Sequence, residues 1–83
     1  MADQQRRITG VVSRAPVAIG SKSEHMAVVL RTEAGEQHIL RRVGGNAFRD
    51  QTLETLVGKT ITGTGRVTGQ TFIMDKWTVE EGT

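Results

Sequence analysis

The chain has no cysteine and no tyrosine, and among its 83 residues it has one proline and three aromatic side chains. Without cysteine, neither a disulfide nor a thiolate metal site can stabilise it. No apolar run reaches the roughly 18 residues that a membrane-spanning helix needs. The charged start of the chain is not followed by the apolar stretch of a signal peptide. These absences predict a cytoplasmic domain with no membrane segment.

The net charge is only +2, from 11 basic and 9 acidic residues. This excess is too small to identify a nucleic-acid partner by itself. Eight of the eleven basic residues are arginine, and the planar guanidinium group suits phosphate and carboxylate recognition. A chain of this length forms one domain that buries only about 60% of its unfolded surface. The composition therefore permits an anionic partner and predicts a small, single core.

One short amphipathic helix interrupts a series of strand-like segments. Strands are expected over residues 7–13, 25–32 and 37–43 before it, and over residues 59–67 and 71–79 after it. The helix is expected over residues 48–58, with an apolar stripe formed by Phe48, Leu53, Leu56 and Val57. Such a short helix must pack on the sheet, and it is expected to plug one end of a barrel.

The predicted boundaries depend on a few residues with special backbone preferences. Asp50 is the expected N-cap of the helix, with Asn46 as an alternative one turn earlier. Gly58 stands where a left-handed C-cap glycine belongs. Pro16 is expected to end the first strand, since proline cannot donate to a strand ladder. Residues 17–24 then form a loop.

The turn between the second and third strands predicts their register. Glu33-Ala34-Gly35 fits a three-residue hairpin loop, a type I turn followed by a left-handed glycine. This loop places Leu30 opposite His38 and Val29 opposite Ile39. A loop of even length would set Glu33 opposite Glu36, and like charges across a ladder cost up to about 1 kcal/mol.

No pattern in the chain indicates catalysis. His25 and His38 lie on separate strands and form no HxH or HExxH arrangement, and His38 is expected to pack against apolar neighbours or at the rim of the sheet. The sequence therefore predicts no enzyme, no cofactor and no metal. The segment Gly44-Gly45-Asn46 has two interpretations: exposed backbone N–H groups that bind an anion, or a steric turn into the helix.

The order of three strands, one helix and two strands resembles the OB-fold superfamily from about residue 7 to residue 79. This resemblance implies an all-β fold: a five-stranded Greek-key barrel with its helix between the third and fourth strands. Residues 10–16, Gly-Val-Val-Ser-Arg-Ala-Pro, are similar to the opening of single-stranded DNA-binding and primosomal proteins. The chain departs from these proteins because it lacks their aromatic residues on the second to fourth strands and their long loop between the last two strands. Their DNA-stacking residues therefore have no counterparts here.

The resemblance, together with the arginines, predicts a non-enzymatic module that binds single-stranded nucleic acid. OB barrels bind through the second and third strands and the adjoining loops. The basic residues expected there are Arg14, Lys22, Arg31, Arg41, Arg42 and Arg66. The alternative prediction is a protein-interaction barrel, either a subunit of an assembly or a homodimer. Val29 and Ile39 motivate this alternative, since the expected register pairs them on the outer face of the sheet, where exposed apolar residues can mark an interface.

Overall fold

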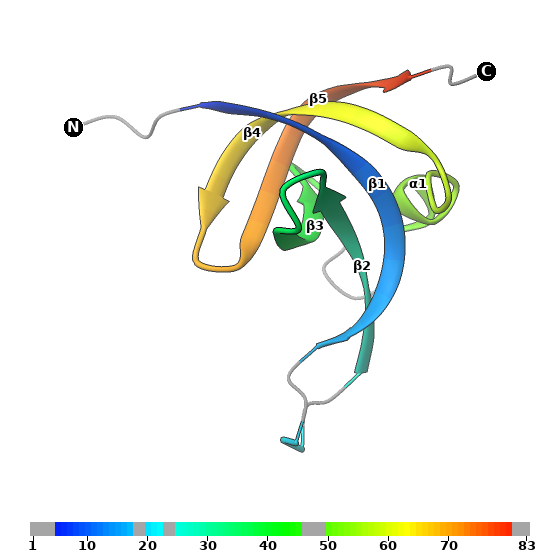
Figure 1. Cartoon of the computed structure of the whole chain (residues 1–83), viewed down its shortest axis with the longest axis vertical. Helices are drawn as coiled ribbons and strands as arrows, with labels where there is room; N and C mark the ends of the chain where they lie inside the picture. Colours follow the sequence, from blue (N-terminus) through cyan, green and yellow to red (C-terminus); the bar gives the residue numbers. More distant parts are fainter. Residues whose placement is uncertain (1–4, 18–19, 23–24, 46–49, 81–83) are drawn as a thin grey trace.

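A computed structural model describes residues 5–17, 20–22, 25–45 and 50–80 of the chain. These residues form five strands and one short helix, which lies between the third and fourth strands (Figure 1). The elements are β1 (Arg6–Val17), β2 (His25–Thr32), β3 (Gln37–Arg42), α1 (Gln51–Glu54), β4 (Thr60–Thr68) and β5 (Thr71–Glu80). The all-β prediction is confirmed. β2 has the predicted bounds, and the bounds of β3, β4 and β5 agree with the predicted ones within one residue.

The five strands form one sheet that closes on itself in the order β1-β2-β3-β5-β4. All neighbouring strands are antiparallel except β3 and β5, which are parallel. β1 completes the ring because it has two partners. Its first half pairs with β4 and its second half with β2, and the strand curves strongly between them (Figure 1).

The predicted hairpin between β2 and β3 is confirmed. Gly35 has a φ of 88°, the left-handed conformation that glycine adopts without steric cost. Its N–H donates to the carbonyl oxygen of Thr32 at 3.0 Å, and the Thr32 N–H donates to that of Glu36 at 2.9 Å. Leu30 lies opposite His38 and Val29 opposite Ile39. The turn chemistry therefore sets the register that the sequence predicted.

The prediction that Pro16 ends the first strand is wrong. β1 continues to Val17, and Pro16 pairs with Met26 of β2. The pairing of β1 with β4 ends at Val11, so the later part of β1 has a strand partner on one side only. Proline is tolerated on such an edge because its missing N–H removes no ladder hydrogen bond.

The helix is shorter than predicted, although its N-cap is correct. Asp50 has extended backbone angles, and its carboxylate accepts a hydrogen bond from the Thr52 N–H. After Glu54 the hydrogen bonds span three residues. The Leu56 N–H donates to the carbonyl oxygen of Leu53 at 3.0 Å, and the Val57 N–H donates to that of Glu54 at 3.3 Å. Such three-residue spacing replaces the α-helical one at the end of a helix. Asn46 and Phe48 lie outside the described residues.

The core fills the interior of the sheet and extends under the helix. Leu53 and Leu56, from α1 and the turn after it, are buried together with residues from all five strands. The described part of the apolar stripe, Leu53, Leu56 and Val57, therefore packs on the sheet as expected. Gly65 faces inward on β4, where an added methyl group would overlap the backbone carbonyl of Ile73. Only glycine allows β4 and β5 to approach so closely at this point.

Candidate nucleic-acid interface

Two predicted arginines lie in one cross-strand row on the outer face of the sheet. Arg41 of β3 is opposite Ile73 of β5, and Ile73 is opposite Arg66 of β4. Two strand spacings separate the arginines, about 10 Å between their Cα atoms. Both side chains are exposed, and Ile73 between them is half-buried. The row thus presents two guanidinium groups on either side of an apolar residue.

Arg31 belongs to the same outer face but lies nearer its other end. It is exposed and is opposite Gln37 of β3 and Val11 of β1. Among the described residues, no carboxylate forms an ion pair with Arg31 or Arg41. The outer face therefore has cationic groups near both ends of its paired strands.

Between these ends lies a less polar row, and its exposure differs from the expectation. Ser13, Val29, Ile39 and Thr71 follow one another across β1, β2, β3 and β5. Val29 was expected to be exposed on the barrel exterior, but it is completely buried, while Ile39 is half-buried. A residue in the middle of a sheet face is flanked by side chains of both neighbouring strands. The exposed apolar pair that motivated a protein interface is therefore absent.

Arg14 and Arg42 are engaged with acidic residues near the helix. Arg14 pairs with Glu54 of α1. The Nε atom of Arg42 lies 3.0 Å from Oδ1 and 2.8 Å from Oδ2 of Asp50. The Asp50 carboxylate is nearly buried, and Arg42 supplies the opposite charge that burial of a carboxylate requires. These two arginines therefore stabilise the junction between sheet and helix, and the structure does not place them with the outer-face arginines.

Gly45 supports this junction. Its N–H donates to the backbone carbonyl of Arg42 at 3.0 Å, so this donor is not available to an anion. A methyl group on Gly45 would overlap the carboxylate of Asp50. Of the two interpretations of the glycine segment, the steric turn into the helix is favoured for Gly45.

Lys22 lies in the loop that joins β1 to β2. Figure 1 shows that the described loop residues, 20–22, lie well away from the sheet. Lys22 is exposed, and the described part of the loop is limited to residues 20–22. Of the six predicted basic residues, the fold thus brings Arg31, Arg41 and Arg66 to one face, and it gives Arg14 and Arg42 structural partners.

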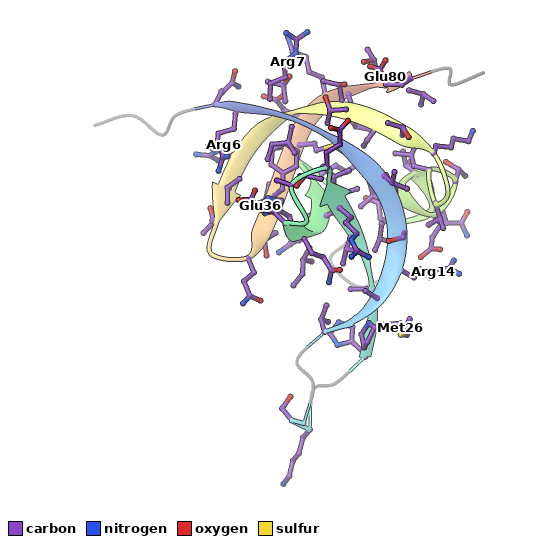
Figure 2. All side chains as sticks on the ribbon, viewed as in Figure 1. Arg6, Arg7, Arg14, Met26, Glu36 and Glu80 are labelled. Carbon is purple, nitrogen blue, oxygen red and sulfur yellow. The ribbon has the colours of Figure 1, made fainter. Side chains whose placement is uncertain are left out.

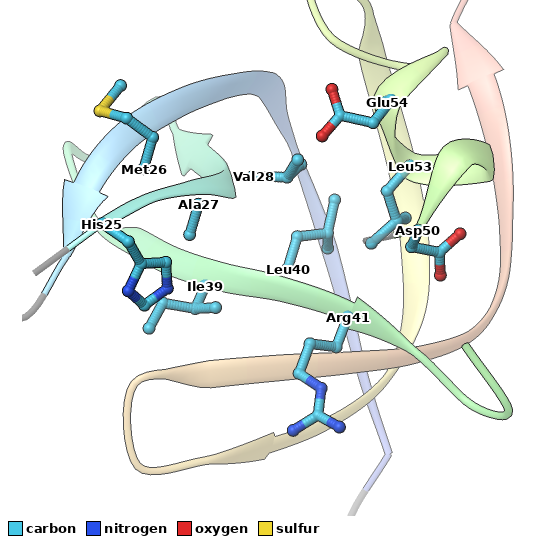
Figure 3. A pocket seen from close by; sticks show the side chains of 10 residues that line it. All are labelled: His25, Met26, Ala27, Val28, Ile39, Leu40, Arg41, Asp50, Leu53 and Glu54. Carbon is cyan, nitrogen blue, oxygen red and sulfur yellow. The ribbon is translucent and has the colours of Figure 1, made fainter. Parts of the chain in front are cut away.

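A hollow of about 110 Å³ lies where β2 and β3 diverge beside α1 (Figure 3). The pairing of these two strands stops at Val29 and Ile39, although β2 continues along β1 to His25. Leu40 and Arg41 extend to opposite sides of β3, with Leu40 toward the helix. Asp50 and Glu54 also line the hollow, and their carboxylates already have arginine partners. We therefore assign no chemistry to it.

A second hollow, of about 160 Å³, opens on the part of the outer surface formed by β1, β4 and β5. Its lining residues are Arg7, Thr62, Thr64, Lys76, Trp77 and Thr78. Arg7 is opposite Thr64, and Thr64 is opposite Lys76. The sequence pattern does not indicate Arg7 or Lys76 as site residues, because their proximity depends on an irregular register between β4 and β5.

His38 is buried on the inner face, as its apolar neighbours predicted. Its ring centroid lies 6.4 Å from that of Phe72, and its Nε2 atom is 3.7 Å from a carboxylate oxygen of Glu36. In the described part of the chain, no group of three or more His, Cys, Asp or Glu residues could hold a metal ion. His38 therefore contributes to packing.

Nor does any helix among the described residues have the length and apolar character needed to cross a membrane. Compared with known protein families, curated proteins and solved structures, the chain matches none.

Proposed function

We propose that this protein is an OB-fold module that binds single-stranded nucleic acid without catalysing a reaction. The binding surface in this proposal is the outer face of β2, β3, β5 and β4. Arg31, Arg41 and Arg66 would contact the phosphate groups. Lys22 would approach the strand from the β1–β2 loop.

The strand order supports the fold assignment. An OB-fold is a five-stranded, partly open Greek-key barrel that binds oligonucleotides or oligosaccharides on its second and third strands and adjoining loops. Here the ring runs β1-β2-β3-β5-β4, and the helix lies between β3 and β4. Arg31 is on β2 and Arg41 on β3, which is the face that this fold uses for binding.

The row Arg41–Ile73–Arg66 is the observation that carries the proposal. It holds two exposed arginines whose Cα atoms are about 10 Å apart, fixed by backbone pairing on three neighbouring strands. Such spacing lets both guanidinium groups contact one extended polyanion, and arginine forms paired hydrogen bonds with phosphate oxygens. Ile73, between them, offers an apolar contact for a sugar or base.

The chemistry of this face favours binding that is governed by charge. Typical single-strand binders gain roughly 1–3 kcal/mol per base from stacking on aromatic side chains. Phe72 is completely buried in the core, so it offers no stacking surface there. Phosphate contacts would therefore supply most of the affinity, with little preference for base sequence and a steep loss of affinity in salt.

A titration of a fluorescently labelled oligonucleotide, followed by anisotropy at low salt, tests the proposal. The wild-type protein should bind the single strand, and Arg31→Glu/Arg41→Glu should abolish this binding. Lys59→Glu is a control, because Lys59 is exposed and lies before β4, outside the proposed face. No binding by the wild type, or equal binding by the double variant, would refute the function.

The alternative of a protein-interaction barrel has less support. It depended on exposure of both Val29 and Ile39, and Val29 is completely buried. Ile39 alone offers a half-buried apolar surface. Light scattering that shows a stable dimer, disrupted by Ile39→Ser, would restore this alternative.

A further inference from the structure

The hollow on β1, β4 and β5 combines positive charge with hydroxyl groups. Arg7 and Lys76 lie on either side of Thr64 in one cross-strand row. This arrangement repeats that of Arg41 and Arg66 on either side of Ile73. Both cations are exposed, and Figure 2 shows Arg7 directed away from the barrel.

None of the described residues that line this hollow is acidic, although two acidic residues lie near it. Asp75 accepts a hydrogen bond from the Gln5 side chain at 2.9 Å. Glu80 accepts one from the Thr62 hydroxyl at 2.9 Å. Their carboxylates thus have donors of their own, while no described carboxylate forms an ion pair with Arg7 or Lys76. The electrostatic character of the hollow therefore favours an anion.

Trp77 adjoins the hollow, but its side chain lies on the other face of the sheet. Trp77 is opposite Gly63, and Gly63 is opposite the buried Ile8, so these three residues share the inner face. The indole is half-buried and packs against the core. The hollow itself thus offers cations and hydroxyl groups, which suit a phosphate group.

The hollow is continuous with the proposed binding face along β4 and β5. Arg66 is opposite Ile73, and two residues earlier on β4, Thr64 is opposite Lys76. This step is about 7 Å along the strand. A register shift between Thr64 and Gly65 leaves Asp75 as the extra residue of a bulge, and bulges increase the local twist of a strand pair. The cations thus follow a path from β3 across β5 and β4 to β1.

We propose that this hollow is a second subsite for the same single strand. Arg7 and Lys76 together bind one phosphate group of that strand. This inference depends on the proposed function, and it extends the bound length of the strand beyond the β2–β3 face.

Trp77 supplies a local probe, because its fluorescence is the only tryptophan signal of the protein. Strands of about 5 and about 15 nucleotides should be compared, a range that spans the site sizes of OB folds. The longer strand should quench Trp77 fluorescence, and Arg7→Gln/Lys76→Gln should remove this quenching. For that strand the double variant should also lower the salt slope by about 0.7, from the one phosphate contact that is lost. Binding of the shorter strand to the Arg41–Arg66 row should be unchanged.

Arg6→Gln/Lys59→Gln is the matched control, because both residues are exposed and neither lines the hollow. If Arg41→Gln/Arg66→Gln weakens binding but Arg7→Gln/Lys76→Gln behaves like the control, the subsite is refuted and the proposed function stands. If only Arg7→Gln/Lys76→Gln weakens binding, the subsite stands and the proposed face is wrong. Absence of any binding by the wild type at low salt refutes both.

Discussion

Arg41 and Arg66 come from strands that are not neighbours, yet they lie in one cross-strand row with Ile73 of β5 between them. The parallel pairing of β3 with β5 creates this relationship, since it inserts β5 between β3 and β4. The two arginines are 25 positions apart in the chain. The basic face is therefore a product of the strand order, and a run of basic sequence does not create it.

The first prediction concerns salt. Each phosphate contact to a single strand contributes about 0.7 to the slope of log affinity against log salt concentration. Arg41→Gln/Arg66→Gln should therefore reduce this slope by about 1.4 between roughly 50 and 200 mM salt. Lys59→Gln should leave the slope unchanged, and anisotropy titrations measure both. An unchanged slope in the double variant would exclude phosphate contacts by this row.

The second prediction separates structural arginines from binding ones. Arg42→Gln leaves the nearly buried Asp50 carboxylate without its charged partner. This variant should lower the free energy of unfolding by about 1–3 kcal/mol, measured by urea denaturation, while the folded fraction should keep its affinity for the oligonucleotide. Arg41→Gln should do the opposite, with weaker binding and stability within about 0.5 kcal/mol of wild type. A stable Arg42→Gln protein that no longer binds would show that the two roles are wrongly assigned.

The third prediction tests the close approach of β4 to β5. Gly65→Ala introduces a methyl group that overlaps the carbonyl of Ile73. The strands must then move apart, and overpacking of this kind costs about 1–3 kcal/mol or more. Thr64→Ala, the neighbouring residue on the outer face, should cost less than Gly65→Ala. Thermal unfolding followed by circular dichroism measures both, and equal stability of the two variants would contradict the assigned contact.

The fourth prediction follows from the burial of Val29. Val29→Ala removes two methyl groups from a completely buried position, at about 0.8 kcal/mol for each group plus the cost of any cavity. Ile39 is half-buried and lies opposite Val29. Ile39→Ser should therefore lower the urea midpoint of unfolding less than Val29→Ala does. Should Val29→Ala have no effect on the urea midpoint, this position would be exposed in solution and the protein-interface alternative would regain its basis.

The sequence predicts those parts of the fold that depend on local chemistry. Glu33-Ala34-Gly35 defines the turn, and the turn sets the pairing of Leu30 with His38. Asp50 caps the helix, as its short acidic side chain indicated. The error at Pro16 has a different origin: whether a proline interrupts a strand depends on which side of the strand has a partner, and only the closed sheet determines this.

The candidate site is less predictable, because it depends on contacts between distant elements. The carboxylates that engage Arg14 and Arg42 become neighbours only when the helix docks. The pairing of Lys76 with Thr64 requires a bulge at Asp75, and no simple residue pattern predicts this bulge. Alternation along β2 correctly places Val29 on the outer face, but it does not show how completely the neighbouring strands cover it.

Amide nitrogen–proton spectra of the 9.1 kDa protein, recorded during titration with a single-stranded oligonucleotide, test the central claim most directly. The largest shift changes should occur at Arg41, Ile73 and Arg66, and they should reverse when salt is added. Amides near the Arg42–Asp50 junction should change little. Shift changes that are absent at low salt, or that avoid this row, would contradict binding of nucleic acid by this face.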